Sequence, residues 1–291
     1  MPTFSIDGEL VNPEAANISV MDHGLLYGDG VFEGLRFYSR RVFCCADHLD
    51  RLTDSAQAIG LQLPMSHQEM VQAIAATIEA SDQQDGYIRL IVTRGAGPLG
   101  IDSTLCMNPR TIIIVDQLSL VPDAVLQTGI KIIIAATRRF SPDQLDPRIK
   151  SLNYLNQIMA RREATAAGAN EAILLNQWGR IAEGSADNLF IAKAGVLKTP
   201  PISEGALDGI TRKVVLQLAA QHNIAIEQCP LTPMDLSTSD ECFLTGTGAE
   251  MIPVSVVGDQ PLSAQRPIFD QLQKAFRAHV RQFAETPATS R

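Results

Sequence analysis

The order of strand-like and helix-like stretches in the first 116 residues is the feature that most constrains the fold. Apolar residues alternate around Asp7-Gly8, which is a strong signal for a β-hairpin at Phe4 to Val11. Two helical patterns follow in succession, at His48 to Ile59 and at Ser66 to Ser81, where Ser66 and Glu69 form a capping box. Strand patterns cover Val31 to Tyr38, Arg41 to Phe43, Gly86 to Thr93 and Thr111 to Asp116. Because a regular βαβ alternation would place a helix between each pair of strands, this order predicts an α+β fold.

The chain is long enough for two domains. It has 291 residues, of which 45% are hydrophobic, and a domain averages roughly 150 residues. The stretch 117–129 contains Pro122 and follows the last strand of the first half, so we interpret it as the interdomain connection. We therefore expect a smaller N-terminal α+β domain over 1–120 and a larger C-terminal domain over 121–291. The helices expected in the larger domain are Leu152 to Ala167, Arg212 to His222 and Pro267 to Ala284.

Charge and composition narrow the class of ligand. The net charge is -8 and no run of Lys and Arg is longer than a pair, so a nucleic-acid partner is not expected. The longest apolar runs are far shorter than the roughly 20 residues that a membrane span needs. The N-terminus lacks the pattern of an export signal, and the five cysteines suit neither a disulfide framework nor a zinc site. We expect a cytoplasmic protein with reduced cysteines that acts on small molecules.

One glycine-rich segment has the spacing of a dinucleotide-binding loop, Gly95-Ala-Gly97-Pro-Leu-Gly100. Its context argues against that function, because Pro98 interrupts it and the next strand begins at about Thr111, which leaves too little chain for the required helix. We interpret the segment as a mobile loop near a site. The five histidines have no paired spacing, so no metal site is expected.

Two loops of small residues are candidates for binding a phosphate. Asp208-Gly-Ile-Thr-Arg212 stands directly before a helix, where free backbone N–H groups and the helix dipole attract anions. Thr245-Gly-Thr-Gly-Ala249 follows an apolar strand and offers backbone and hydroxyl donors. A threonine before a helix is usually only a cap, so each loop alone is a weak signal. Together they favour one bound phosphate.

Lysines are scarce: the chain has six, and none precedes residue 131. A covalent amine would therefore have to come from the second half. Lys150 differs from the others because it stands between a Pro-containing loop and an apolar helix, where its side chain could point inward. Taken alone, any of the six is more simply explained as a solvated surface residue.

Seven motifs give the chain a recognisable pattern. They are Tyr27-Gly-Asp-Gly-Val-Phe-Glu-Gly34, His48-Leu-Asp-Arg-Leu52, Tyr87-Ile-Arg89, Lys150 with Asn153-Tyr-Leu155, Glu183-Gly-Ser-Ala-Asp-Asn-Leu189, Gly209-Ile-Thr-Arg212 and Gly246-Thr-Gly-Ala-Glu250. In this order and spacing the chain resembles the branched-chain aminotransferase family, within the fold type IV enzymes. The resemblance implies a two-domain fold of the D-amino acid aminotransferase type, a homodimer or higher oligomer, and pyridoxal 5'-phosphate as the cofactor.

The resemblance also implies a role for each cofactor residue. Lys150 would bond covalently to the cofactor and later shuttle a proton. Glu183 would keep the pyridine nitrogen protonated, and Tyr154 would hydrogen-bond to the phenolic oxygen of the ring. The residues that would hold the phosphate are Arg51, Ile210, Thr211 and Thr247. A non-catalytic binding protein is disfavoured, because both the lysine and the carboxylate are present.

The substrates follow from the same resemblance. Phe32 and Gly34, with Tyr87 and Arg89, match the branched-chain pattern, in which aromatic walls enclose an aliphatic chain and the arginine helps to bind acidic substrates. Two further residues complete the implied substrate-binding set, Tyr27 and Gly248. The expected reaction transfers the amino group of L-leucine, L-isoleucine or L-valine to 2-oxoglutarate. Three alternatives use the same cofactor: an aminodeoxychorismate lyase, a D-amino acid aminotransferase and an R-selective amine transaminase.

Overall fold

The computed structural model describes residues 1–117 and 123–285, which fall into two compact units. The first unit contains the described residues of Met1–Ser119, Ile149–Asn153 and Val280–Arg291. The second contains those of Leu120–Arg148 and Tyr154–His279. Lys150 was expected in the larger C-terminal domain over 121–291, but it belongs to the first unit. None of the described helices is long and apolar enough to span a membrane.

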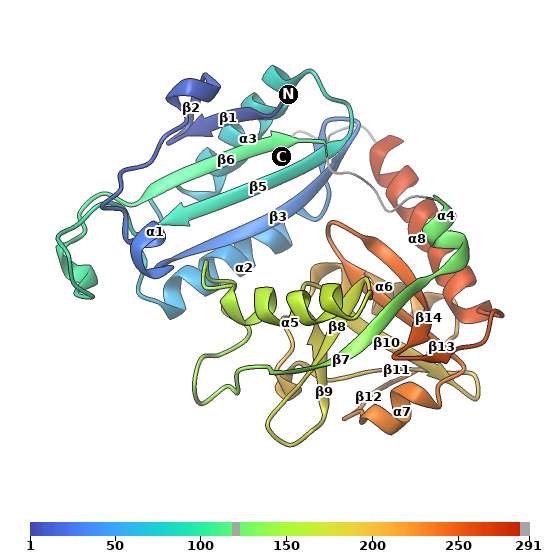
Figure 1. Cartoon of the computed structure of the whole chain (residues 1–291). Coiled ribbons are helices and arrows are strands. Elements are labelled where there is room, and N and C mark those ends of the chain that lie inside the picture. The colour runs from blue at the N-terminus through green and yellow to red at the C-terminus, as the bar shows by residue number, and fades with distance from the viewer. Residues whose placement is uncertain (118–122, 286–291) are drawn as a thin grey trace. The chain divides into compact units, whose positions relative to one another are not determined.

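An antiparallel sheet of six strands forms the first unit, in the order β2-β1-β6-β5-β3-β4 (Figure 1). The predicted hairpin is confirmed by β1 (Thr3–Ile6) and β2 (Glu9–Val11), with Asp7 and Gly8 both at positive φ in the turn. The other strands also lie within one residue of their predicted bounds. They are β3 (Gly30–Tyr38), β4 (Arg41–Val42), β5 (Gly86–Thr93) and β6 (Arg110–Asp116).

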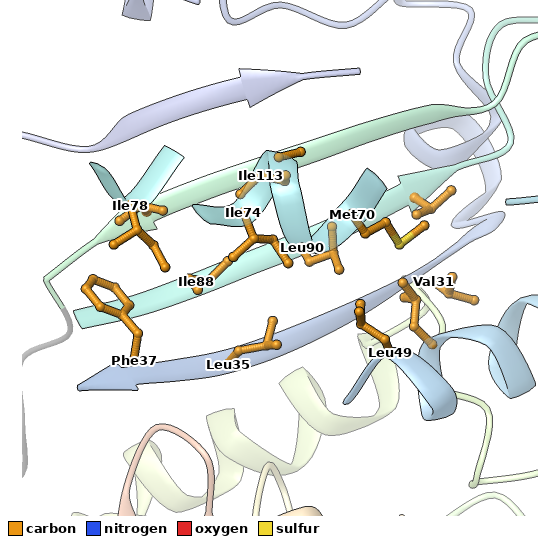
Figure 2. Packing of buried hydrophobic residues seen from close by; sticks show 14 of the residues in the cluster. Val31, Leu35, Phe37, Leu49, Met70, Ile74, Ile78, Ile88, Leu90 and Ile113 are labelled. Carbon is orange, nitrogen blue, oxygen red and sulfur yellow. The ribbon is translucent and has the colours of Figure 1, made fainter. Parts of the chain in front are cut away.

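Helices α2 (Cys45–Ala58) and α3 (His67–Ser81) pack against this sheet. The predicted capping box of α3 is confirmed, since Ser66 and Glu69 each accept a hydrogen bond from the other's backbone N–H. Side chains alternate along a strand, so every second residue of β3 points toward the helices. Figure 2 shows apolar side chains that meet there: Val31, Leu35 and Phe37 of β3, Ile88 and Leu90 of β5, Leu49 of α2, and Met70, Ile74 and Ile78 of α3. Phe32 and Gly34 consequently face the other way.

Three short helical turns of the first unit were not predicted: η1 (Pro13–Ala15), α1 (His23–Tyr27) and η2 (Ser103–Leu105). A single turn is too short to show a hydrophobic period, so pattern analysis misses it. Helix α1 is defined by its ends instead. Asp22 Oδ1 accepts a hydrogen bond from Gly24 N at 2.7 Å, and Gly28 ends the helix in the left-handed conformation at φ 72°.

A mixed sheet forms the second unit, in the order β12-β11-β10-β13-β14-β7-β8-β9, with β15 paired to β14 (Figure 1). Its strands are β7 (Ile130–Arg138), β8 (Glu171–Leu175), β9 (Ile181–Gly184), β10 (Asn188–Lys193), β11 (Val196–Thr199), β12 (Ala225–Gln228), β13 (Glu241–Gly246), β14 (Glu250–Val257) and β15 (Gln260–Pro261). The helical elements are α4 (Asp123–Thr128), α5 (Leu155–Ala166), η3 (Ile202–Glu204), α6 (Ile210–Gln221), α7 (Pro233–Ser237) and most of α8 (Pro267–Glu285). Small side chains let α5 lie close to the sheet, because Ala160 and Ala164 pack with Ala135 and Ala172.

The second half of the chain differs from its predicted pattern in several places, which include the unpredicted short elements β15, η3 and α7. Helix α5 begins at Leu155 rather than Leu152, because the residues before it pair with strand β3. Strands β9 and β14 were not predicted; β9 is short and wholly buried, and β14 contains Pro253, which is unusual within a strand. Helix α4 occupies much of the stretch interpreted as the interdomain connection. Residues 118–122 of that stretch lie outside the described residues.

Candidate active site

Lys150 is held at the open edge of strand β3. Strand β4 pairs only with the last two residues of β3, which leaves the start of that edge open. Lys150 O accepts a hydrogen bond from Phe32 N at 3.0 Å, and Leu152 N donates one to Gly30 O at 2.9 Å. Lys150 N also donates to Ser55 Oγ of α2 at 3.1 Å. These backbone contacts fix the lysine against the sheet and explain why its segment belongs to the first unit.

The lysine amine lies near an aromatic ring that also contacts an arginine. Lys150 Nζ is 4.5 Å from the centroid of the Phe32 ring, and Arg89 Cζ is 4.6 Å from the same centroid. Arg89 pairs across the strands with Gly34, and its Cζ lies 5.6 Å from the centroid of the Tyr87 ring. Tyr87 occupies the space left by the missing side chain, since a Cβ on Gly34 would lie 2.0 Å from Tyr87 Oη. The structure thus brings Lys150 together with four of the six residues predicted to bind substrate.

Arg51, predicted to bind the phosphate, is paired with a buried carboxylate that the sequence analysis did not single out. Arg51 Nε and Nη2 donate to Glu33 Oε1 and Oε2 at 2.7 Å each. His48 Nδ1 lies 2.7 Å from Glu33 Oε2. Burial raises the pKa of Glu33, but the hydrogen bonds and positive charge of its two partners outweigh this and lower the pKa to about 2. Glu33 is therefore an anion that fixes the guanidinium of Arg51 from one side.

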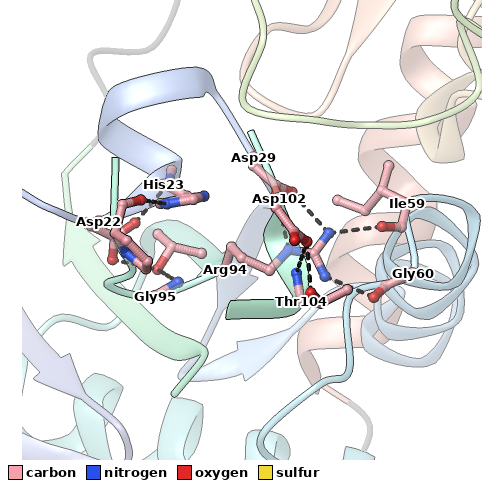
Figure 3. Close-up of polar contacts among 12 residues, drawn as sticks. Asp22, His23, Asp29, Ile59, Gly60, Arg94, Gly95, Asp102 and Thr104 are labelled. Atoms are coloured by element: carbon pink, nitrogen blue, oxygen red, sulfur yellow. Dashed lines mark hydrogen bonds and ion pairs between the residues drawn. The ribbon is translucent and has the colours of Figure 1, made fainter. Parts of the chain in front are cut away.

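Tyr27 lies beside the glycine-rich loop that follows strand β5. Its Oη accepts a hydrogen bond from Gly100 N at 2.9 Å. The loop is not a dinucleotide-binding turn, because β5 and β6 on either side of it are antiparallel neighbours. Figure 3 shows the polar contacts that hold this region together.

Arg94 is the centre of those contacts and was also missed by the sequence analysis. It donates to both carboxylate oxygens of Asp29 at 2.9 Å, and to the carbonyls of Ile59 and Gly60 at 2.7 Å each (Figure 3). The Arg94 side chain is 8% exposed. It therefore ties the segment after α1 to the end of α2 and fixes the start of the loop that contacts Tyr27.

Glu183 stands in strand β9 of the second unit and is held from two sides. Its Oε1 lies 2.9 Å from Arg139 Nε, and its Oε2 accepts a hydrogen bond from Leu207 N at 2.9 Å. Arg139 Nε also lies 3.2 Å from Gly205 O. Both charged side chains are buried, so the pair keeps the carboxylate in a defined orientation. Such a carboxylate suits a ring nitrogen that must retain its proton.

The two candidate phosphate loops lie close to one another in the second unit. A Cβ on Gly209, at the N-cap of α6, would lie 1.8 Å from Asn188 Oδ1. A Cβ on Gly246, at the end of β13, would lie 2.1 Å from Asp187 Oδ1. Each glycine thus allows its loop to approach one of two consecutive residues. The arrangement agrees with the hypothesis of one phosphate held by both loops.

Donors at these loops fit an anionic group. No side chain of the described residues caps α6, and the first two residues of the helix, Ile210 and Thr211, are buried. Thr247 and Gly248 lie in the turn between β13 and β14 and are partly buried. Thr245 Oγ1, next to that turn, is buried and has no hydrogen-bond partner within the part of the chain that the structure describes. Uncapped helix amides and threonine hydroxyls are the donors that bind phosphate, so this set fits the phosphate of the predicted cofactor.

The predicted site residues therefore form two sets. The first unit contains Tyr27, Phe32, Gly34, Arg51, Tyr87, Arg89 and Lys150. The second contains Tyr154, Glu183, Ile210, Thr211, Thr247 and Gly248. Tyr154 is the N-cap residue of α5 and is partly buried.

Known proteins resemble this chain over most of its length. Residues 30–257 match the family described as amino-transferase class IV. A putative branched-chain-amino-acid aminotransferase of Methanocaldococcus jannaschii is 46% identical over 249 residues, which cover 86% of this chain and 85% of the relative. A D-alanine aminotransferase of Bacillus licheniformis is 33% identical over 285 residues, which cover 97% of this chain and 98% of the relative.

Solved structures that resemble this chain indicate the same family. A branched-chain aminotransferase from Thermoproteus uzoniensis with norvaline has a TM-score of 0.91 and 33% identity, covering 97% of this chain and 95% of that chain. The branched-chain amino acid aminotransferase of Escherichia coli has a TM-score of 0.91 and 32% identity, covering 95% of this chain and 93% of that chain. A further structure of a branched-chain amino acid aminotransferase, with a TM-score of 0.91 and 30% identity, holds pyridoxamine 5'-phosphate. The chain therefore belongs to the class IV aminotransferases, fold type IV enzymes that depend on pyridoxal phosphate, and within them to the branched-chain aminotransferase family.

Proposed function

We propose that the protein transfers the amino group of L-leucine, L-isoleucine or L-valine reversibly to 2-oxoglutarate. The observation that carries this proposal is the grouping around the Phe32 ring, whose centroid lies 4.5 Å from Lys150 Nζ and 4.6 Å from Arg89 Cζ. It combines a reactive amine, a cation for an acidic substrate and an apolar wall for an aliphatic one. The names of the relatives and of the solved structures support the same substrate class.

Lys150 carries the covalent and proton-transfer steps. Its amine would hold the cofactor covalently and, when not bonded to it, would move a proton to and from the α-carbon of the substrate. Pyridoxal phosphate, when bound, supplies an electron sink for the charge that develops at that carbon. Glu183 holds a proton at the pyridine nitrogen, and its contacts with Arg139 and Leu207 keep the carboxylate in position. Tyr154 would hydrogen-bond to the phenolic oxygen of the cofactor ring.

The phosphate is held by charge and by backbone donors. Arg51 supplies the positive charge. The first amides of α6, at Ile210 and Thr211, donate hydrogen bonds, a role supported by the lack of a capping side chain on that helix among the described residues. The hydroxyl of Thr247 adds a further donor.

The substrate site must bind an aliphatic side chain in one half-reaction and the acidic side chain of glutamate in the other. Phe32 and Tyr87 provide the apolar wall, and the cation of Arg89, close to both rings, binds the second carboxylate of glutamate. Gly34 makes room for Tyr87 against the sheet. We assign two further residues to the same function, Tyr27 and Gly248.

A D-amino acid aminotransferase is the second candidate, because the D-alanine aminotransferase relative matches 97% of this chain. The two are separated by spectral titration of the purified protein with a panel of amino donors and no acceptor. L-Leucine, L-isoleucine and L-valine are expected to convert the bound cofactor to its aminated form, whereas D-alanine and R-amines are not. Faster conversion by D-alanine than by L-leucine would reject the proposal. Release of pyruvate from aminodeoxychorismate without an oxoacid acceptor would instead indicate a lyase.

We also propose that the enzyme works in the cytoplasm as a homodimer or larger homo-oligomer. Two segments rich in large exposed apolar side chains support self-association, because clusters of such side chains mark interaction surfaces. In these two segments of the first unit they are Ile18, Val20, Leu25, Leu99, Ile101, Leu105 and Met107. Sedimentation velocity at micromolar protein tests this: we expect a species of at least twice the 31.5 kDa chain mass. A species of single-chain mass would contradict the assembly.

A further inference from the structure

Glu33 is a charged residue in an apolar row. It lies on β3 between Val31 and Leu35, on the face that packs against the helices, and its side chain is fully buried. Removing a carboxylate from water costs several kcal/mol unless hydrogen bonds and opposite charge compensate. The cost of burying the Glu33 carboxylate is compensated, since Arg51 and His48 together make three contacts of 2.7 Å with its oxygens.

The arrangement orients the guanidinium of Arg51 more than it stabilises the fold. A buried ion pair contributes little to stability compared with apolar side chains of similar volume, and the residues on either side of Glu33 in this row are already apolar. What the carboxylate adds is orientation: two oxygens accept from Nε and Nη2, which fixes the plane of the guanidinium. His48 fixes the carboxylate in turn. A carboxylate only accepts, so the Nδ1 of His48 carries the hydrogen.

We propose that Glu33 is a positioning residue for Arg51, and that with His48 it sets the orientation in which the guanidinium binds the phosphate of the cofactor. This inference rests on the proposed role of Arg51. A phosphate engages arginine best through two parallel hydrogen bonds, so the direction of the guanidinium plane matters as well as its charge. The contact with Glu33 uses two of the three guanidinium nitrogens and prevents rotation about the end of the side chain.

If Glu33 acts only through its charge, removing its carboxylate should change the affinity for the phosphorylated cofactor in one direction. If Glu33 positions Arg51, the change should have the opposite direction. A negative charge near a phosphate site repels the ligand, so its removal alone should strengthen phosphate binding. If Glu33 instead orients Arg51, its removal should weaken binding of the phosphorylated cofactor. Binding of pyridoxal, which lacks the phosphate, should not change.

The experiment compares the dissociation constants of pyridoxal 5'-phosphate and of pyridoxal for the full-length protein freed of cofactor, measured by absorbance titration. Glu33→Gln keeps the side-chain volume and should raise the constant for pyridoxal 5'-phosphate by about tenfold or more, the scale of a lost charge-assisted hydrogen bond. The dissociation constant for pyridoxal should stay within about twofold of its wild-type value. Asp50→Asn is the matched control, since it removes an exposed carboxylate next to Arg51 on the same helix, and it should change neither constant.

Two further variants separate the outcomes. Glu33→Asp keeps the charge but draws the carboxylate back, so it should also weaken binding of the phosphorylated cofactor; it decides the question if Glu33→Gln does not fold. Arg51→Gln should reduce the preference for pyridoxal 5'-phosphate over pyridoxal at least as much as Glu33→Gln does, and adding Glu33→Gln to it should not weaken binding further. Unchanged or tighter binding of pyridoxal 5'-phosphate in both Glu33 variants would overturn the inference. If Arg51→Gln keeps the preference, the proposed role of Arg51 fails instead.

Discussion

Substituting Gly34 by alanine tests the proposed substrate site through one cross-strand contact. A methyl group at this position would lie 2.0 Å from Tyr87 Oη and 2.8 Å from Tyr87 Cζ, whereas ordinary contacts begin at 3.4 Å. The end of the ring must therefore move by about 1.4 Å. Because Tyr87 approaches Gly34 with the end of its side chain, we expect the ring to swing aside, which moves it relative to Phe32 and Arg89. The free energy of unfolding should fall by about 1 kcal/mol, the low end of the cost of overpacking.

The effect on the reaction should be larger than the effect on stability. A displacement of about 1 Å in a group that positions substrate can cost roughly 100-fold in rate, so we expect kcat/KM for L-leucine to fall by about 10- to 100-fold in Gly34→Ala. Stopped-flow measurement of the L-leucine half-reaction gives this value, and urea denaturation gives the stability. Adding Tyr87→Phe removes the contact at 2.0 Å but leaves the one at 2.8 Å, so the double variant should recover part of the loss. Wild-type kinetics in Gly34→Ala would refute the reasoning.

Three further substitutions address other parts of the account. Arg89→Ala should slow the half-reaction with glutamate by about 10- to 100-fold more than that with L-leucine, because a charge-assisted hydrogen bond is lost. Stopped-flow measurement that finds equal losses in both half-reactions, together with lower thermal stability, would indicate that Arg89 has only a structural role. Glu183→Gln should keep the fold, since its amide oxygen can still accept from Arg139 although the hydrogen bond from Leu207 N is lost. It should lower turnover by a large factor with little change in cofactor affinity, and near wild-type turnover would refute the role. Arg94→Ala should lower the free energy of unfolding by about 3 kcal/mol, the scale of a broken buried pair, while Arg40→Ala, which breaks two exposed ion pairs, should cost less than about 1 kcal/mol. Equal effects of these two in urea denaturation would contradict the structural role of Arg94.

Local signals in the sequence were sufficient to predict much of the secondary structure of the first unit. The hairpin at Asp7-Gly8 and the capping box of α3 depend on residues within a few positions of one another, so their chemistry is visible in the sequence alone. Strand β5 was predicted with its observed bounds, because most of its residues are apolar, aromatic or β-branched. Strand β9 was missed although it carries Glu183, since four buried residues give no measurable period.

Contacts between distant parts of the chain were not predictable in this way. Lys150 pairs with the edge of β3 only because β4 is too short to cover that edge, a consequence of the assembled sheet. The partners of Arg51, Arg94 and Arg139 are likewise set by tertiary structure. The family resemblance supplied the candidate role of Arg51, but the carboxylate of Glu33 that holds it became evident only from the geometry.

The central claim, that Lys150 bears the cofactor, has a direct test. The purified protein incubated with pyridoxal 5'-phosphate is expected to be yellow, and borohydride should reduce the covalent link and leave a stable adduct. Peptide mass spectrometry should then find the phosphopyridoxyl group on Lys150, with Lys150→Ala as the control that loses both the colour and the adduct. An adduct on any of the other five lysines, or none at all after incubation, would contradict the account.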